Sequence, residues 1–332
     1  MTVPQIDGYG LFNDTANQIV SGGFSLRPTD ILSDVFAVFT AQVRDFSKTA
    51  AVIVIMALLS STVGTLNSSF GKNSAGQAAF FVFFTVISGL LLSCFSTAMG
   101  YAAEVIGQMT SFMDKLTPVL IMSLFTCCKS VSAAAFEPVL SAVVYAVSLV
   151  IEKCLVPLMT FSAVLSVVGS FGDTNSISGF IKIIRSVTKW LMAFIITLFT
   201  GINAVYGFSV SSLDAISAKA IKFAMGSLVP IVGGFLSDSL DTVTTSAALI
   251  KNAVGVSGIV IICLIVMTPV IKIGAMQLMM KLCAAVVEPM TDKRISDMLW
   301  NMSETITAVF GTVVLTAVLF VLNICIILRA TG

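Results

Sequence analysis

Apolar residues gather in blocks long enough to cross a membrane as helices, and short polar segments separate these blocks. The first two blocks cover residues 49–66 and about 78–100. A helix crosses the hydrocarbon core of a bilayer with about 20 apolar residues, whereas the strands of a membrane barrel would alternate apolar and polar residues. The pattern therefore predicts an all-α, polytopic membrane protein.

The region before the first block, residues 1–48, is the largest polar region of the chain. Within it, the segment 28–48 places apolar residues at helical spacing, with Asp34, Arg44 and Asp45 elsewhere on the helical wheel. This spacing predicts an amphipathic helix that lies on the membrane or on a partner, or that simply leads into the first span.

From residue 116 onward, the apolar residues run almost unbroken to residue 171, which is too long for two spans and awkward for three full ones. A half-span at 116–128, followed by helices at 133–151 and 154–171, fits this length best. The remaining predicted segments are an interfacial basic linker at 172–189, a span at 190–208, a second half-span from Gly226, an apolar stretch at 254–287, a charged loop at 288–304 and a last span at 305–328. The predicted membrane domain covers residues 49–328.

Two pairs of prolines indicate an internal repeat. Pro118 and Pro230, each two residues after a leucine, are 112 residues apart, and Pro157 and Pro269 are separated by the same number. The shared offset predicts two copies of one unit, at about residues 75–171 and 187–283, with a helix at each end.

Each predicted copy contains a half-length apolar segment that ends in polar residues. Lipid cannot satisfy the backbone groups freed at such a break, so broken segments at matching places in two repeats indicate a transport site. The backbone of these broken or re-entrant half-spans is predicted at Pro118, Pro230, Gly233 and Gly234. The charged residues beside the breaks, which we expect to form a paired polar centre or to line a hydrated path, are Lys129, Glu137, Asp238, Asp241 and Lys251. Alternatively, these polar stretches are ordinary aqueous loops between full spans.

Composition agrees with a membrane protein and excludes several functions. Of the 332 residues, 57% are hydrophobic and 11% are charged, whereas roughly 25% of a soluble domain is charged. The net charge of +1 indicates no nucleic-acid partner. The chain has no histidine, and its seven cysteines form no CxxC pair. We therefore expect no catalytic triad, metal site or cofactor, and no enzyme.

The stretch SLVPIVGGFLSDSLDTVTTSAALIKNAVGVSGIVII, residues 227–262, resembles the stage III sporulation protein AE family of endospore-forming bacteria. The likeness continues through TPVIKIGAMQLMMKLCAAVVEPMTDKRISDML, residues 268–299, and covers most of the chain from about residue 30. Its most specific part is the Pro-x-x-Gly-Gly stretch from Pro230 to Gly234, followed by Ser237 and Asp238.

This resemblance implies a non-enzymatic membrane subunit of the channel, or feeding-tube, complex between mother cell and forespore during sporulation. It also implies a multi-pass protein of the mother-cell membrane around the forespore, with other membrane and ring proteins of that complex and the lipid bilayer as partners. Family members usually carry a cleavable leader. The N-terminal MTVPQIDGYG has neither a basic nor an apolar leader region, which implies a trimmed chain with residues 1–48 outside the cytoplasm.

Three functions fit the sequence. In the first, the repeats of a channel-complex subunit form or gate a small-molecule conduit. In the second, the protein is an autonomous secondary transporter with its substrate site at the repeat interface. In the third, it is a structural platform for ring proteins, and Asp238 and Asp241 are then packing or loop residues.

Overall fold

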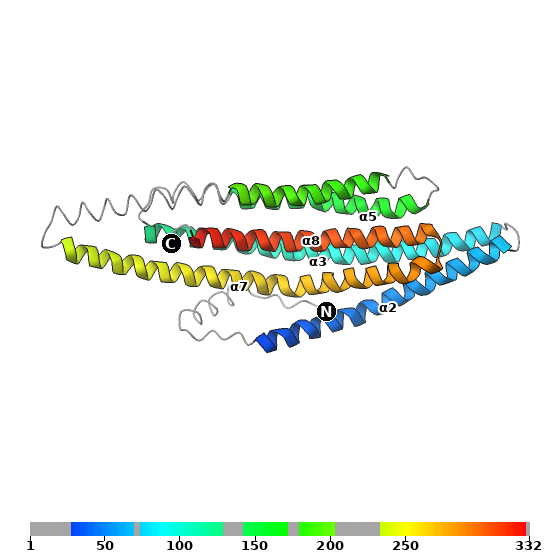
Figure 1. The fold of residues 1–332 in the computed structure, drawn as a ribbon, viewed down its shortest axis with the longest axis horizontal. Coiled ribbons are helices and arrows are strands. Elements are labelled where there is room, and N and C mark those ends of the chain that lie inside the picture. Colours follow the sequence, from blue (N-terminus) through cyan, green and yellow to red (C-terminus); the bar gives the residue numbers. More distant parts are fainter. Residues whose placement is uncertain (1–27, 70–73, 129–141, 172–178, 203–232, 330–332) are drawn as a thin grey trace.

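The computed structural model describes residues 28–69, 74–128, 142–171, 179–202 and 233–329, and nearly all of these residues are helical. The helices are α2 (Pro28–Ser69), α3 (Ser74–Cys128), the run Ala142–Phe171 that ends in α5 (Val156–Phe171), the helix Gly179–Ile202, α7 (Gly233–Val287) and α8 (Lys293–Arg329). Successive helices run in opposite directions along one elongated bundle (Figure 1).

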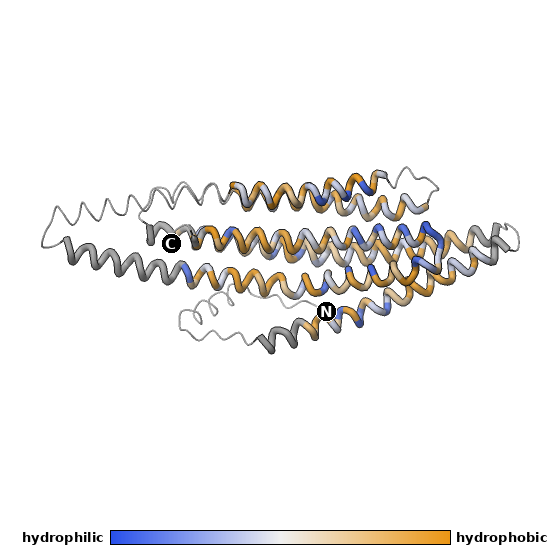
Figure 2. The backbone as a smooth tube through the Cα atoms, viewed as in Figure 1, coloured by the Kyte–Doolittle hydropathy of each residue, from blue (hydrophilic) through white to orange (hydrophobic). Residues whose placement is uncertain are grey.

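Six helices of the described chain are long and apolar enough to cross a membrane. These candidate spans are Phe36–Thr65, Ala78–Leu120, Ala142–Phe171, Gly179–Ile202, Asn252–Met290 and Lys293–Ile326. Apolar residues cover most of their length, and hydrophilic residues gather where α7 turns into α8 (Figure 2). The predicted class, an all-α polytopic membrane protein, is therefore confirmed. A helix suits the bilayer because its backbone hydrogen bonds are satisfied within the segment.

Helix α7 lies at the centre of the bundle, where it contacts α2, α3 and α8. The other side of α8 is covered by α5. One apolar core runs through these contacts, with Ile53 of α2, Leu91 of α3 and Phe320 of α8 all fully buried. Large apolar side chains therefore hold α2, α3, α7 and α8 together.

Small residues let the helices approach closely at particular points. At Gly258 of α7, a Cβ atom would lie 2.7 Å from Cδ2 of Leu116 on α3 and 3.5 Å from Cδ1 of Ile324 on α8. Three helices thus meet around a position that has no side chain. Such small-residue contacts are typical of helix packing in membranes, where lipid is as apolar as the helices and close van der Waals contact drives association.

Prolines lie inside these helices without ending them. The helices thus continue where the sequence predicted interruptions. Residues 116–128, predicted as a half-span, are the end of α3, which passes through Pro118. Of the helix predicted at 133–151, residues 142–151 are described, and a π-helical turn, Ile151–Leu155, joins them in one run to the helix predicted at 154–171, just before Pro157; residues 133–141 lie outside the described residues. Proline removes one hydrogen-bond donor and crowds the preceding turn, and a local π-turn relieves both effects without ending the helix.

Two other predicted boundaries also differ. The predicted span 49–66 is part of α2, which begins at Pro28 and has no break at residue 48. The predicted linker 172–189 and span 190–208 share the single helix Gly179–Ile202, and the rest of both segments lies outside the described residues. In both cases one helix runs from a polar segment directly into an apolar one, because a change in polarity along the chain does not by itself end a helix.

The predicted charged loop 288–304 is helical over most of its length. A short 3-10 helix, Glu288–Met290, follows α7, and α8 begins at Lys293. Between the charges of this segment, four apolar residues at helical spacing are completely buried, and these are Ile295, Met298, Leu299 and Met302. Their burial against the bundle forms the first turns of α8 as an amphipathic helix.

The internal repeat stays a prediction. Pro118, Pro157 and Pro269 lie in helices, and Pro230 lies outside the described residues. Three of the four marker positions therefore share a helical setting, and the fourth is not compared.

Candidate functional site

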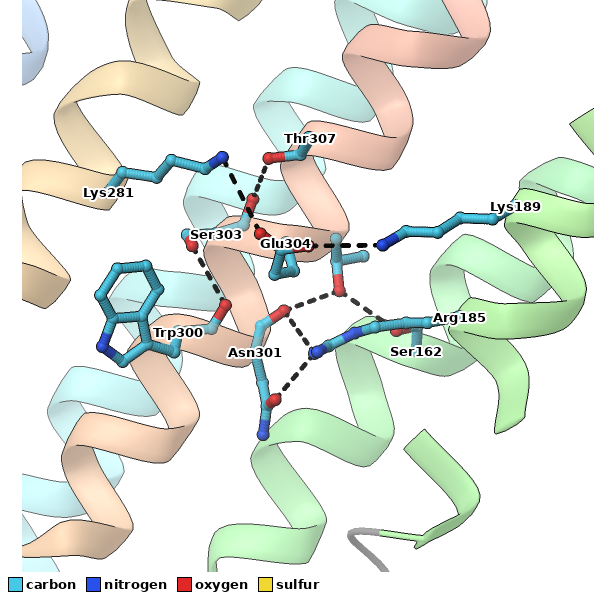
Figure 3. A network of polar contacts seen from close by, with 10 residues as sticks. Ser162, Arg185, Lys189, Lys281, Trp300, Asn301, Ser303, Glu304 and Thr307 are labelled. Atoms are coloured by element: carbon cyan, nitrogen blue, oxygen red, sulfur yellow. Dashed lines mark hydrogen bonds and ion pairs between the residues drawn. The ribbon is translucent and has the colours of Figure 1, made fainter. Parts of the chain in front are cut away.

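Charged and polar side chains from three helices meet near the turn between α7 and α8 (Figure 3). Arg185 and Lys189 come from the helix Gly179–Ile202, and Lys281 comes from α7. Their partners are Asn301 and Glu304, which lie one turn apart on α8. Each of these charges interrupts an apolar span, and ionisable residues within spans are functional candidates by default.

Glu304 lies between two lysines. Its carboxylate oxygens are 3.9 Å from Nζ of Lys189 and 3.8 Å from Nζ of Lys281. Glu304 is 34% exposed and Lys281 is 37% exposed, whereas Lys189 is 73% exposed. Ion pairs of this length and exposure contribute at most about 1 kcal/mol each, because water screens them. Glu304 thus acts as a shared counter-charge that aligns α7 and the helix Gly179–Ile202 on α8.

Arg185 makes shorter contacts than the lysines that pair with Glu304. Its Nη2 atom donates to the main-chain oxygen of Asn301 at 2.8 Å and to the side-chain Oδ1 of Asn301 at 2.9 Å. The same main-chain oxygen accepts a hydrogen bond from Thr305 Oγ1 at 2.9 Å, and the hydroxyl of Thr305 is 3.1 Å from that of Ser162 on α5. One line of polar contacts therefore connects Gly179–Ile202, α8 and α5.

Hydroxyl groups continue inward along the α5–α8 contact. Ser162, Ser166 and Ser170 of α5 are buried one turn apart, and Ser166 and Ser170 donate to the main-chain oxygen four residues earlier. On α8, Thr312 and Thr316 are buried and bond in the same way. These local bonds satisfy the hydroxyls, so the small side chains allow close helix packing without leaving a donor unpaired.

Asn323, further along α8, is different. It is completely buried, and neither its amide nitrogen nor its amide oxygen has a hydrogen-bond partner. An unpaired amide inside an apolar bundle destabilises the fold, so packing alone gives no reason for an asparagine at position 323.

We expect Arg185→Met to lower the free energy of unfolding by about 1–2 kcal/mol, because charge-assisted hydrogen bonds contribute more than neutral ones. Methionine keeps the length of the apolar stem and removes both bonds to Asn301. The measurement is unfolding of the purified protein by SDS titration, followed by tryptophan fluorescence. The control is Lys182→Met, one turn away at an exposed position. Equal effects of both substitutions would contradict a specific role of Arg185.

Most of the residues predicted to form the site are not brought together in the described chain. Gly233 and Gly234 are the first residues of α7, and Asp238, Asp241 and Lys251 follow in the same helix. Pro118 lies within α3. Lys129, Glu137 and Pro230 lie outside the described residues. The predicted polar centre therefore stays a prediction, while α7 is continuous from Gly233 onward.

The sequence had shown only half of the observed network. The basic linker that it predicted at 172–189 contains Arg185 and Lys189, but the sequence showed no partner for either. Lys281 and Glu304, which complete the network, stand near the ends of apolar blocks, and that isolation was the available signal. No group of three or more metal-binding side chains occurs among the residues that the structure describes. The network positions helices and shows no arrangement for covalent chemistry.

Comparison with known proteins gives one family. The family model described as stage III sporulation protein AE matches residues 11–331 of the chain. The stage III sporulation protein AE of Bacillus subtilis (strain 168) is 27% identical over 313 residues, which are 94% of this chain and 78% of that relative. No solved structure matches the chain.

Proposed function

Because the chain belongs to the stage III sporulation protein AE family, we propose that this sporulation protein is a non-enzymatic membrane subunit of the channel complex between mother cell and forespore. It lies in the mother-cell membrane that surrounds the engulfed forespore and assembles there with other membrane proteins and ring-forming proteins. The family match, the six candidate spans and the shape of the bundle support this proposal.

The observation that carries the proposal is the length of α3 and α7. Each helix has 55 residues. At 1.5 Å per residue each is about 80 Å long, against about 30 Å for the hydrocarbon core of a bilayer. Both helices therefore extend well beyond one membrane, which an assembly subunit needs and a simple carrier does not.

The extension can be located from contacts within the bundle. Leu328, at the end of α8, lies against Gly255 of α7, and Leu116 of α3 lies against Gly258. The segment 233–254 of α7 and the last residues of α3, after about residue 121, therefore continue past the end of α8 (Figure 1). They carry Asp238 and Asp241, which share a helix face at a spacing of three residues. This projecting end is the surface that we assign to partner proteins.

The test is affinity purification of the tagged chain from sporulating cells in which it replaces the resident copy. We expect other stage III membrane proteins to co-purify at a fixed ratio. The variant Asp238→Lys, Asp241→Lys should reduce that co-purification at least several-fold, because the charge of the projecting face is reversed. As a matched control, Glu152→Lys changes an exposed acid on another helix and should leave the co-purification unchanged.

The competing functions predict other outcomes. An autonomous transporter would purify alone and move a solute in liposomes. A structural platform would co-purify with its partners, and substitutions in the membrane spans that leave assembly intact would not change spore formation. Purification of the chain by itself, with full rescue of sporulation, contradicts the proposed function.

A further inference from the structure

The basic side chains around Glu304 exceed its charge (Figure 3). Arg185, Lys189 and Lys281, called the basic cluster below, carry three positive charges, whereas Glu304 carries a single negative one. Arg185 donates to neutral atoms of Asn301, and among the described residues it has no carboxylate within ion-pair distance. Its Nε–H group is buried and has no acceptor. The network therefore lacks negative charge and hydrogen-bond acceptors.

The basic cluster lies where the apolar parts of two helices begin. On α8, Glu304 is followed by 24 residues without a charge, 305–328, which form a helix about 36 Å long. That length crosses the hydrocarbon core of a bilayer, which is about 30 Å thick. On the helix Gly179–Ile202, no residue after Lys189 is charged. The basic cluster is therefore at the edge of the core, where lipid head groups lie.

Both tryptophans of the chain lie at this level. Trp190 follows Lys189 directly and is 65% exposed. Trp300 is one turn before Glu304, and its indole Nε1 donates to Glu288 at 3.0 Å. Tryptophan is enriched at the boundary between membrane and water, because its ring suits the apolar side and its N–H group suits the polar side. The two rings thus indicate the head-group level independently of the charges.

Exposed apolar side chains follow both lysines toward the bilayer core. Ile196, seven residues after Lys189, is 43% exposed. Leu278, three residues before Lys281 on α7, is 47% exposed. Residues at these spacings share a face of a helix. A molecule bound at the basic cluster can therefore contact cations with one part and apolar side chains with another.

The two lysines approach one carboxylate from opposite sides (Figure 3). Nζ of Lys189 is 3.9 Å from Oε2 of Glu304, and Nζ of Lys281 is 3.8 Å from Oε1. A single phosphate in contact with both ammonium groups would also lie against this carboxylate, and the like charges would repel each other. Two phosphates, one at each lysine, avoid this repulsion and balance the excess of two positive charges.

We propose that the basic cluster binds the head group of an anionic phospholipid that carries two phosphates, one beside Lys189 and the other beside Lys281. Its acyl chains lie along the apolar side chains that follow the two lysines. Lysine and arginine hold phosphates through charge-assisted hydrogen bonds, and basic sites between membrane helices suit such head groups. An acidic protein segment or free phosphate would supply the charge without the acyl chains. The inference goes beyond the proposed function and needs only the chain and a bilayer.

The test uses the purified full chain in phosphatidylcholine vesicles, with its two tryptophans as reporters. A lipid with brominated acyl chains quenches tryptophan fluorescence only when it lies close to the ring. Brominated cardiolipin has two phosphates, and we expect it to quench at a roughly tenfold lower mole fraction than brominated phosphatidylcholine. Brominated phosphatidylglycerol, with one phosphate, should lie between them. Raising the salt concentration should reduce the preference, because salt screens the charges.

The site is identified with paired substitutions. Lys189→Gln together with Lys281→Gln should abolish most of the roughly tenfold preference for cardiolipin, because both phosphate contacts are lost. As a matched control, Lys153→Gln together with Lys293→Gln removes two exposed lysines elsewhere and should leave the preference unchanged. An equal loss in both pairs would show that surface charge in general attracts the lipid, and the proposal would be wrong.

The wild-type chain alone can also overturn the proposal. Equal quenching by all three brominated lipids would show that the cluster selects no head group. Displacement of cardiolipin by millimolar inorganic phosphate would identify a free anion as the occupant, and displacement by a soluble polyglutamate peptide would identify an acidic protein segment. These measurements use the isolated chain, so either result leaves the co-purification test of the proposed function unaffected.

Discussion

Gly258→Leu should destabilise the bundle by about 1–3 kcal/mol or more, because it forces a large side chain into a closed junction of three helices. Already the first added atom, Cβ, would lie 2.7 Å from Cδ2 of Leu116 and 3.5 Å from Cδ1 of Ile324. Both neighbours are buried, so neither can swing into solvent. SDS titration of the purified protein measures the loss, and the yield of heat-resistant spores should fall with it.

Two variants keep this result specific to the junction. Gly258→Ala adds only the first atom, which a small movement of the flexible Leu116 end can accommodate, and should destabilise far less. Gly64→Leu makes the same change on α2, where a Cβ atom meets nothing within 4 Å. If Gly64→Leu and Gly258→Leu were equally harmful, helix propensity and not the junction would be the cause.

Asn323→Leu should stabilise the isolated protein by about 1–3 kcal/mol, because it removes a buried amide whose donor and acceptor are both unpaired. Leucine has the same number and branching of heavy atoms as asparagine, with a larger volume, and suits the apolar surroundings, since the adjacent Ile324 and nearby Phe320 are fully buried. The measurement is the midpoint of SDS unfolding, compared with that of Val318→Leu, a change at an exposed position of the same helix.

The functional result of Asn323→Leu should have the opposite sign. Natural proteins keep an unfavourable buried group where it serves another purpose, so we expect the stabilised variant to form fewer heat-resistant spores. Stabilisation without any loss of spores would show that Asn323 is a dispensable defect. Destabilisation of the isolated protein would contradict the unpaired state of Asn323.

Gly258→Leu and Asn323→Leu both act where α8 packs against neighbouring helices, and the buried polar groups of α8 differ in how they are paired. Hydroxyls such as Ser166 and Thr316 pair with the main chain of their own helix, so they add little polarity to the contact. Asn323 makes no such bond and stays unpaired. Helix α8 therefore tolerates buried hydroxyls, and its buried amide differs from them in having no partner.

The class of the fold followed from the order of residues along the chain. Apolar blocks of span length can only be helices or barrel strands in lipid, and their continuous apolar character left helices. Local signals were also sufficient at the start of α8, where Ile295, Met298, Leu299 and Met302 repeat at helical spacing. The charges between them led to the prediction of a loop, because charge density was weighed above periodicity.

Helix ends and breaks depended on the surroundings. Proline usually marks an interruption, yet α3 and α7 continue through Pro118 and Pro269. Neighbouring helices and local π-turns supply what a proline removes, and neither is visible in a short window of sequence. For the same reason the predicted re-entrant half-spans could not be distinguished from the ends of long continuous helices.

The candidate site needed the folded chain. Arg185 and Asn301 are 116 positions apart, and only the packing of the helix Gly179–Ile202 against α8 brings them within hydrogen-bond distance. Arg185 and Lys189 already stand at helical spacing in the sequence. Periodicity shows that such residues share a side of a helix. Which side faces outward is set by the neighbours that cover the opposite one, and that depends on long-range contacts.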